Sequence, residues 1–143
     1  MDLRDGLQMQ EPAVFVPWTA TVAGLQQLLG VHGLHHVTSG YYVLSDCVPI
    51  VGLRCKLGFH FIPRGGDRLH ELEFFRHSYE DQAQSFREFQ QHFESAFGPP
   101  TTTRRGEEGY PTHEWALPGA RIIHLVQERF GLEEHVRIQR TGA

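Results

Sequence analysis

LRCKLGFHF, residues 53–61, is the stretch that decides the fold. Its apolar side chains alternate with Arg54, Lys56, Gly58 and His60 in a period of two. Because neighbouring side chains of a strand point to opposite faces, this period predicts a half-buried β-strand. The apolar members, which define the expected core face, are Leu53, Cys55, Leu57, Phe59 and Phe61.

The residues that follow predict a hairpin. Residues 63–67 (PRGGD) have the composition of a turn, and residues 68–76 (RLHELEFFR) are typical of a returning strand. We expect Leu72 and Phe74 on the core face of that strand. The other set, expected to face away from the core, is Leu69, Glu71, Glu73 and Phe75.

A first helix is predicted before this hairpin, over residues 20–29. Apolar side chains recur there at helical spacing. Thr19 or Thr21 is placed to accept hydrogen bonds as the N-cap. Gly30 is expected to end the helix in a left-handed conformation.

A second helix is predicted over residues 79–97. Its apolar stripe includes Phe86 and Phe93, which we expect to be buried because a helix of this length is not stable on propensity alone. Ser78 is the expected N-cap. Gly98 and the two prolines after it end the helix.

The remaining pattern completes an α+β fold. Residues 101–110 are a polar loop, and four more strands are predicted at residues 41–47, 113–117, 121–127 and 134–140. Strands joined by short turns pair antiparallel, so we expect an antiparallel sheet of about six strands with two helices packed on one face, in the order helix-βββ-helix-βββ. Residues 1–143 form one domain, with 1–12 as a loose lead-in and 141–143 as a frayed tail.

Composition narrows the function classes. Hydrophobic residues make up 40% and charged residues 21% of the 143, as in ordinary globular domains. The net charge of -4 argues against a nucleic-acid partner. Residues 1–12 hold no apolar signal segment, and no apolar run reaches the length of a membrane span. We therefore expect a cytoplasmic protein without a membrane partner, in which Cys47 and Cys55 are reduced thiols.

Residues with catalytic or metal-binding chemistry do not form a recognisable signature. Three of the ten histidines cluster at positions 32, 35 and 36, but the spacing does not match that of a zinc site, so we expect neither metal nor cofactor. Cys55 falls on the apolar face, where a thiol is inert. Glu71 and Glu73 are a candidate carboxylate pair for hydrolysis, although a solvated strand face is the favoured interpretation. We assign no catalytic residue.

One group of residues supports a binding hypothesis. The polar face of the first hairpin strand lies beside that of the second, which gives a mixed-charge surface with an aromatic side chain. Such a surface suits an electrostatically specific protein contact, although an ordinary charged sheet surface is the alternative. The candidate partner-binding residues are Arg54, Lys56, His60, Glu71, Glu73 and Phe75, with Glu107 and Glu108 as further acidic attraction.

Four motifs are similar to those of small bacterial cytosolic proteins of toxin–immunity loci. They are GLRCKLGFHF (52–61), RGGDRLHELEFFR (64–76), FGPP (97–100) and HEW (113–115), and the likeness extends over about residues 20–140. Its positions, such as Phe59, Gly98 and Trp115, are ones that packing and turns also explain, so it carries over no catalytic residue. The resemblance implies a stoichiometric inhibitor of a co-encoded toxin.

Three functions remain open from the sequence. The leading hypothesis is a non-enzymatic protein-binding domain, an immunity protein that occludes a toxin domain. The second is a small-molecule-binding or enzymatic domain with a pocket between the helices and the sheet. The third is a homo-oligomeric protein that associates through an exposed strand edge.

Overall fold

The computed structural model describes residues 1–62 and 68–142. The expected turn at residues 63–67 lies outside the described residues. The elements, in chain order, are β1 (Gly6–Gln8), β2 (Phe15–Pro17), α1 (Val22–Leu29), the 3-10 helix η1 (Gly30–His32), β3 (Leu34–Thr38), β4 (Tyr41–Ile50), β5 (Leu53–Ile62), β6 (Arg68–Phe75), α2 (Gln82–Phe97), β7 (Thr102–Arg104), the 3-10 helix η2 (Glu107–Gly109), β8 (Thr112–Leu117), β9 (Ala120–Glu128) and β10 (Leu132–Arg140). None of the helices within these ranges is long and apolar enough to cross a membrane.

The sheet is larger than the sequence predicts. One antiparallel sheet has eight strands in the order β3-β4-β5-β6-β10-β9-β8-β7, and β1 pairs with β2 in a separate two-stranded sheet. The α+β class with two α-helices is confirmed, whereas the expected number of about six strands was wrong. The additional strands are β1, β2, β3 and β7. Of these, β3 and β7 are edge strands whose side chains are mostly exposed, so they show no apolar alternation.

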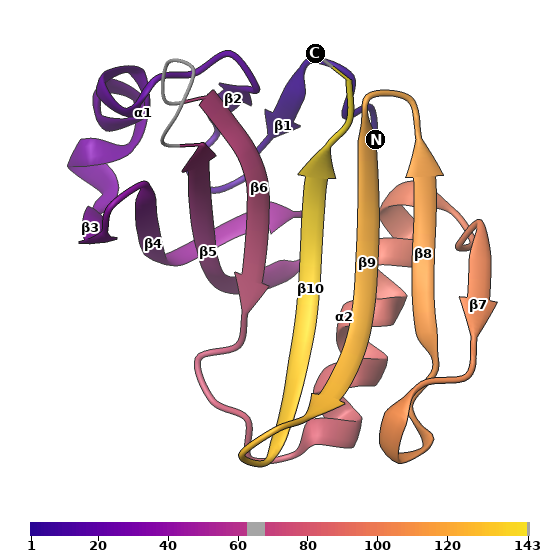
Figure 1. Ribbon diagram of the computed structural model, residues 1–143. Helices are drawn as coiled ribbons and strands as arrows, with labels where there is room; N and C mark the ends of the chain where they lie inside the picture. Colours follow the sequence, from indigo (N-terminus) through magenta and orange to yellow (C-terminus); the bar gives the residue numbers. More distant parts are fainter. Residues whose placement is uncertain (63–67, 143) are drawn as a thin grey trace.

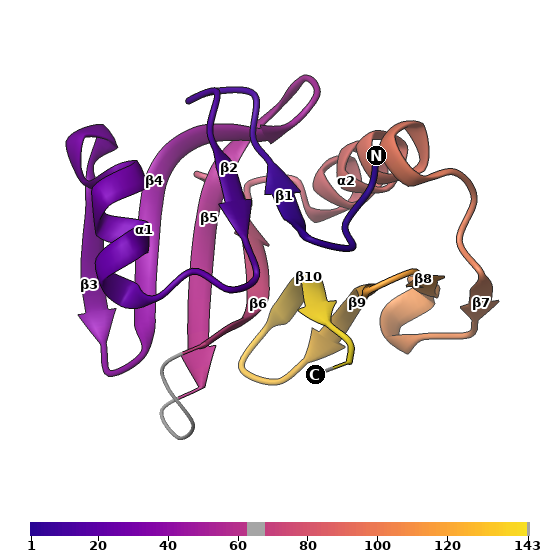
Figure 2. The same ribbon diagram turned by 90° about the horizontal axis from the view of Figure 1, so that it is seen from above.

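The helices and the β1–β2 pair share one core with the large sheet. In Figure 1, α2 lies behind β9 and β10, and α1 lies beside β3 and β4. From above, α1, the β1–β2 pair and α2 follow one another along the same side of the sheet (Figure 2). A single buried cluster contains Leu25 of α1, Leu7 of β1, Phe93 of α2 and Phe74 of β6. The opposite face of β6, β10 and β9 therefore points away from α2.

The β5–β6 hairpin follows the expected pattern with one correction. The five apolar side chains of β5 are all buried, which confirms the core face predicted for this strand. Leu69, however, is only 1% exposed and joins the core instead of facing away. The register shifts between His60 and Phe61, so His60 pairs with Glu71 but Phe61 pairs with Leu69. This bulge accommodates His70 as an extra residue and turns Leu69 inward.

The first helix starts as expected and ends differently. The Thr21 hydroxyl accepts a hydrogen bond from the Gly24 N–H at 3.0 Å, which makes Thr21 the N-cap. Gly30 has φ −56° and stays right-handed, because the chain continues into η1. The left-handed residue is Gly33, with φ 89°. The expected role of Gly30 was therefore wrong, and Gly33 performs it.

The second helix begins three residues later than expected. Asp81, and not Ser78, is the N-cap, since its carboxylate accepts a hydrogen bond from the Gln84 N–H at 3.0 Å. Gly98, with φ 81°, ends the helix as expected. Phe86 and Phe93 are 7% and 0% exposed, which confirms the buried stripe of α2.

Residues 1–12, expected to be a loose lead-in, pack against the rest of the chain. Leu3, Leu7 and Met9 are each at most 2% exposed, and all three belong to the core cluster. The indole N–H of Trp18 donates to the carbonyl of Leu3 at 2.8 Å. Leu7 lies in β1, which pairs with β2, so this segment adds apolar surface and hydrogen bonds to the fold.

The two cysteines face each other inside the core. Cys47 and Cys55 are cross-strand partners in β4 and β5, and both are buried free thiols. The hydrogen bond with Cys47, together with burial, raises the pKa of the Cys55 thiol. Because the thiolate is the reactive form, we expect neither thiol to react with a water-soluble aromatic disulfide until the protein is unfolded in guanidinium. Absorbance of the released thiol measures this, and rapid titration of both thiols in native buffer would contradict it.

Candidate functional site

A row of polar side chains crosses the face of the sheet that points away from α2. In β6, Leu72 and Phe74 are buried in the core, so Glu71 and Glu73, which alternate with them, occupy the opposite face. Side chains from neighbouring strands continue the line. We call the following set the polar row: His60, Glu71, Glu73, Arg104, Glu114, Arg121, Arg137 and Gln139.

Two carboxylates form the centre of the polar row. Glu73 Oε1 lies 2.8 Å from His60 Nε2, and Glu71 Oε2 lies 3.9 Å from the same nitrogen. The Arg137 guanidinium lies 3.4 Å from Glu73 and 3.8 Å from Glu71. Both glutamates are only 8% exposed, so they depend on these positive and donor groups for the solvation that water no longer supplies.

The charge of Glu73 is maintained by its neighbours. Burial alone would raise the pKa of this carboxyl. The hydrogen bond with His60 and the positive charge of Arg137 outweigh burial, and the pKa of Glu73 lies below its usual value. The carboxylate is therefore ionised at neutral pH and is held in place by His60 and Arg137.

The polar row continues through β10, β9 and β8 to the edge strand β7. The Gln139 amide N–H donates to Glu71 at 2.9 Å, and the Gln139 carbonyl accepts from Arg121 at 3.3 Å. Arg121 also pairs with Glu114 at 2.9 Å. Glu114 in turn pairs with Arg104 at 3.1 Å. Each side chain thus fixes the next one, and the charges alternate along the row.

An aromatic ring closes the other end of the polar row. Tyr41 of β4 stacks on His60 with ring centroids 4.3 Å apart. A Cβ at Gly58 would lie 2.8 Å from the Tyr41 ring, so the glycine in the alternating stretch of β5 makes room for this ring. Burial, followed by the charge of Glu73, raises the pKa of Tyr41, which stays a neutral hydroxyl.

The structure brings together part of the binding set predicted from the sequence. His60, Glu71 and Glu73 form the centre of the polar row, and Lys56 pairs in register with Phe75 on the same two strands. The other three predicted residues are placed elsewhere or paired differently. Arg54 binds Glu11 at 2.6 Å and Asp46 at 3.1 Å, while Glu107 and Glu108 lie in η2, beyond β7 in the chain.

The sequence did not reveal Arg137, Gln139 and Arg121 as members of the row. A signal was present in LEEHVRIQR, residues 132–140, where buried Glu134, Val136 and Ile138 alternate with the outward set. The pairing of β10 with β6, which puts Arg137 opposite Glu73, joins the two halves of the chain. No local pattern predicts that pairing, because it depends on the topology of the whole sheet.

Three residues of the row have the chemistry of metal ligands. One ligand atom from each of His60, Glu71 and Glu73 lies within 4.8 Å of the others. Arg137, however, already approaches both carboxylates and supplies the positive charge that a dication would bring. We therefore interpret this cluster as an ion-pair network. Of the histidines of the metal hypothesis, His32 lies in η1 and His35 and His36 lie in β3, and all three are exposed.

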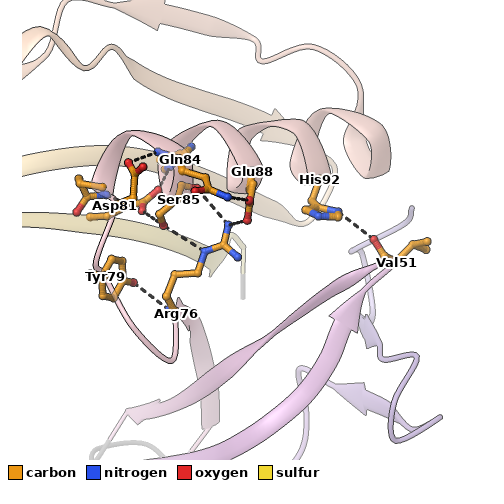
Figure 3. Close-up of polar contacts among 11 residues, drawn as sticks. Val51, Arg76, Tyr79, Asp81, Gln84, Ser85, Glu88 and His92 are labelled. Carbon is orange, nitrogen blue, oxygen red and sulfur yellow. Dashed lines mark hydrogen bonds and ion pairs between the residues drawn. The ribbon is translucent and has the colours of Figure 1, made fainter.

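A second polar cluster is buried between α2 and the sheet. His124 of β9 and Glu134 of β10 are both fully buried, and His124 Nε2 lies 2.5 Å from Glu134 Oε2. The other oxygen of Glu134 accepts hydrogen bonds from Ser85 at 2.6 Å and Gln82 at 2.8 Å. Figure 3 shows how Arg76 reaches the same helix, where it donates to Ser85 at 3.1 Å.

The space between the helices and the sheet is filled by aromatic side chains. Phe93 lies against Phe74 and Trp115, with ring centroids 5.2 and 6.1 Å apart, and Phe86 stacks on His124 at 4.1 Å. Among the described residues, the centre of this layer is a packed core, and a pocket lies at its end, lined by Gln82 of α2 and by Phe75 and Glu134 of the sheet.

The chain matches no family model, no curated protein and no solved structure.

Proposed function

We propose that the chain is a non-enzymatic protein-binding domain that docks its partner on the polar row. The observation that carries this proposal is the mutual fixation of charged side chains on a sheet face that points away from α2. In the row, Arg121 is held by both Glu114 and Gln139, and Glu73 by both His60 and Arg137.

Fixed charges are suited to specific recognition. A side chain that is already ordered loses little conformational entropy when a partner binds. Alternating charges also discriminate among partners, since a misplaced like charge is repelled. Tyr41 and Phe75 add aromatic surface at the β4 and β6 side, of the kind that is enriched at interfaces.

In its specific form, the proposal is that the partner is a co-encoded bacterial toxin domain and that this cytoplasmic chain is an immunity protein that occludes it. The motif resemblance supports this form, and so does the alternation of acidic and basic side chains in the polar row. A surface with interleaved carboxylates and guanidinium groups fits a partner whose own charges alternate, and occlusion needs binding without chemistry. A standard interface of about 1,600 Å² in total would cover the row and its surroundings.

The test is co-expression with the protein encoded beside this chain's gene. We expect a stoichiometric complex and relief of the growth arrest that the neighbour causes alone. Arg121→Glu reverses a charge within the row and is expected to weaken the complex at least about tenfold. Arg87→Glu makes the same change at an exposed position of α2, on the other side of the sheet, and should leave binding intact.

Thermal melting of both variants shows whether each is folded before binding is compared. Absence of a complex with the neighbouring gene product would overturn the immunity proposal. Equal weakening by Arg87→Glu and Arg121→Glu would instead overturn the assignment of the surface.

A further inference from the structure

The turn between β9 and β10 exposes an aromatic side chain completely. Phe130 has a relative exposure of 100%, although phenylalanine is among the residues that proteins bury most often. Arg129, beside it, is also exposed. The turn forms one end of the long β9–β10 hairpin and lies near the loop that joins β6 to α2 (Figure 1). An apolar side chain on a projecting tip has the form of an anchor for a pocket.

A pocket of about 370 Å³ opens beside this tip. Phe75, Tyr79 and Leu132 form its apolar wall, and the carboxyl side chains of Glu73, Glu133 and Glu134 also line it. A cavity of roughly 150 Å³ is enough to hold a benzene ring, so the pocket has room for a phenylalanine side chain. Phe130 of the same chain does not fill the pocket, because it is fully exposed.

The charges of the tip and the pocket are complementary. Arg129 brings a guanidinium next to Phe130, and the pocket offers the carboxylate of Glu133, which is 39% exposed. The contact that the structure gives Glu133 is with His135 Nε2, at 3.5 Å. An Arg–Phe pair entering this pocket would place its ring against the apolar wall and its cation against the Glu133 carboxylate.

Tip and pocket are adjacent in one chain, which favours a two-fold arrangement. Leu132 of the pocket wall is only two residues beyond Phe130. A two-fold axis close to the turn therefore brings each tip onto the other chain's pocket, and both contacts form at once. From this geometry we infer that the chain forms a symmetric homodimer in which Phe130 of each copy fills the pocket of the other.

This surface overlaps the proposed partner site only in part. Glu73 of the pocket belongs to the polar row and Phe75 to the aromatic surface beside it, whereas Arg129, Phe130 and Glu133 belong to neither. The dimer therefore does not depend on the proposed function, and the two are tested with different variants.

Sedimentation from about 1 µM to about 500 µM chain tests the dimer, since a contact of this size is at the weak end of specific interfaces. We expect the mass to rise from one chain to two with increasing concentration. Phe130→Ser should abolish the rise. Val31→Ser removes another highly exposed apolar side chain, 89% exposed in η1, and should leave the rise unchanged.

A charge exchange makes the test specific to this geometry. Arg129→Glu and Glu133→Arg should each prevent self-association, because two like charges then meet at both contacts. An equimolar mixture of the two variants should dimerise, since one contact pairs the two new charges and the other pairs Arg129 with Glu133. The double variant Arg129→Glu/Glu133→Arg should dimerise by itself.

Thermal melting confirms that the variants are folded. A wild-type chain that stays monomeric over the whole range would overturn the inference. So would a Phe130→Ser chain that associates as the wild type does, or a mixture of the two charge variants that stays monomeric.

Discussion

Replacing His124 with leucine is expected to lower the free energy of unfolding by about 3–5 kcal/mol. The reason is the protonation pattern of the buried network. Gln90 donates its amide N–H to Glu94 at 3.0 Å, so its carbonyl must accept from His124 Nδ1, 2.8 Å away. His124 Nε2 is then directed at Glu134, and one proton lies between them. Leucine removes this contact and leaves a fully buried carboxylate without its partner.

The Ser85 hydroxyl shows how far the network is constrained. Its oxygen accepts from Arg76 Nε, so its own proton is available for Glu134. Glu134 therefore receives hydrogen bonds from Ser85 and Gln82 on one oxygen and shares a proton with His124 on the other. Every one of these groups has a partner of the right polarity, which is the condition for a stable buried polar network.

Glu134→Gln removes the charge of this side chain but allows its hydrogen bonds to remain. The amide carbonyl can accept from Ser85 and Gln82, and the amide N–H can donate to a neutral His124, so we expect a loss of only about 1–2 kcal/mol. His124→Leu/Glu134→Gln removes the buried charge and should be destabilised less than the sum of the two single changes.

Urea unfolding, followed by the fluorescence of Trp18 and Trp115, measures these changes in the free energy of unfolding. The control is His35→Leu at an exposed position of edge strand β3, expected to change stability by no more than about 0.5 kcal/mol. A His124→Leu protein as stable as this control would contradict the account of the network.

His124 and Glu134 also show what the sequence predicts and what it does not. In β9, Ala120, Ile122, His124 and Val126 are buried in alternation, so a histidine at an apolar position was a visible sign of an internal polar site. Its partners come from α2 and β10. The short turn predicts the pairing of β10 with β9, but no local pattern encodes the pairing of β10 with β6 or the position of α2 over these strands. Periodicity predicts which face of the sheet a side chain occupies, but it does not predict which residues of other elements that side chain contacts.

Local rules also fail where two neighbouring residues satisfy them equally. Ser78 and Asp81 are both good N-cap residues, and the choice between them depends on where Phe86 and Phe93 must lie to reach the core. Gly30 and Gly33 present the same ambiguity at the end of α1. Leu69 changes face because a bulge, which has no signature in the alternation itself, interrupts β6.

Phe93→Ala is expected to lower the free energy of unfolding by about 3–5 kcal/mol. Phe93 is 0% exposed and packs against Phe74 of β6, Trp115 of β8 and Phe97 of its own helix, with ring centroids 5.2–6.1 Å apart. Alanine would leave a cavity between α2 and strands β6 and β8. The surrounding rings cannot fill this cavity unless the helix moves.

Phe130→Ala is the matched control, because it makes the same substitution at a fully exposed position and should leave stability within about 0.5 kcal/mol in dilute solution. Equal unfolding midpoints for the two variants would contradict the assignment of Phe93 to the core. Gln90 of the same helix binds His124, so a helix displaced by Phe93→Ala also strains the buried network. The effects of Phe93→Ala and His124→Leu should therefore combine to less than their sum, since the first already weakens the contacts that the second removes.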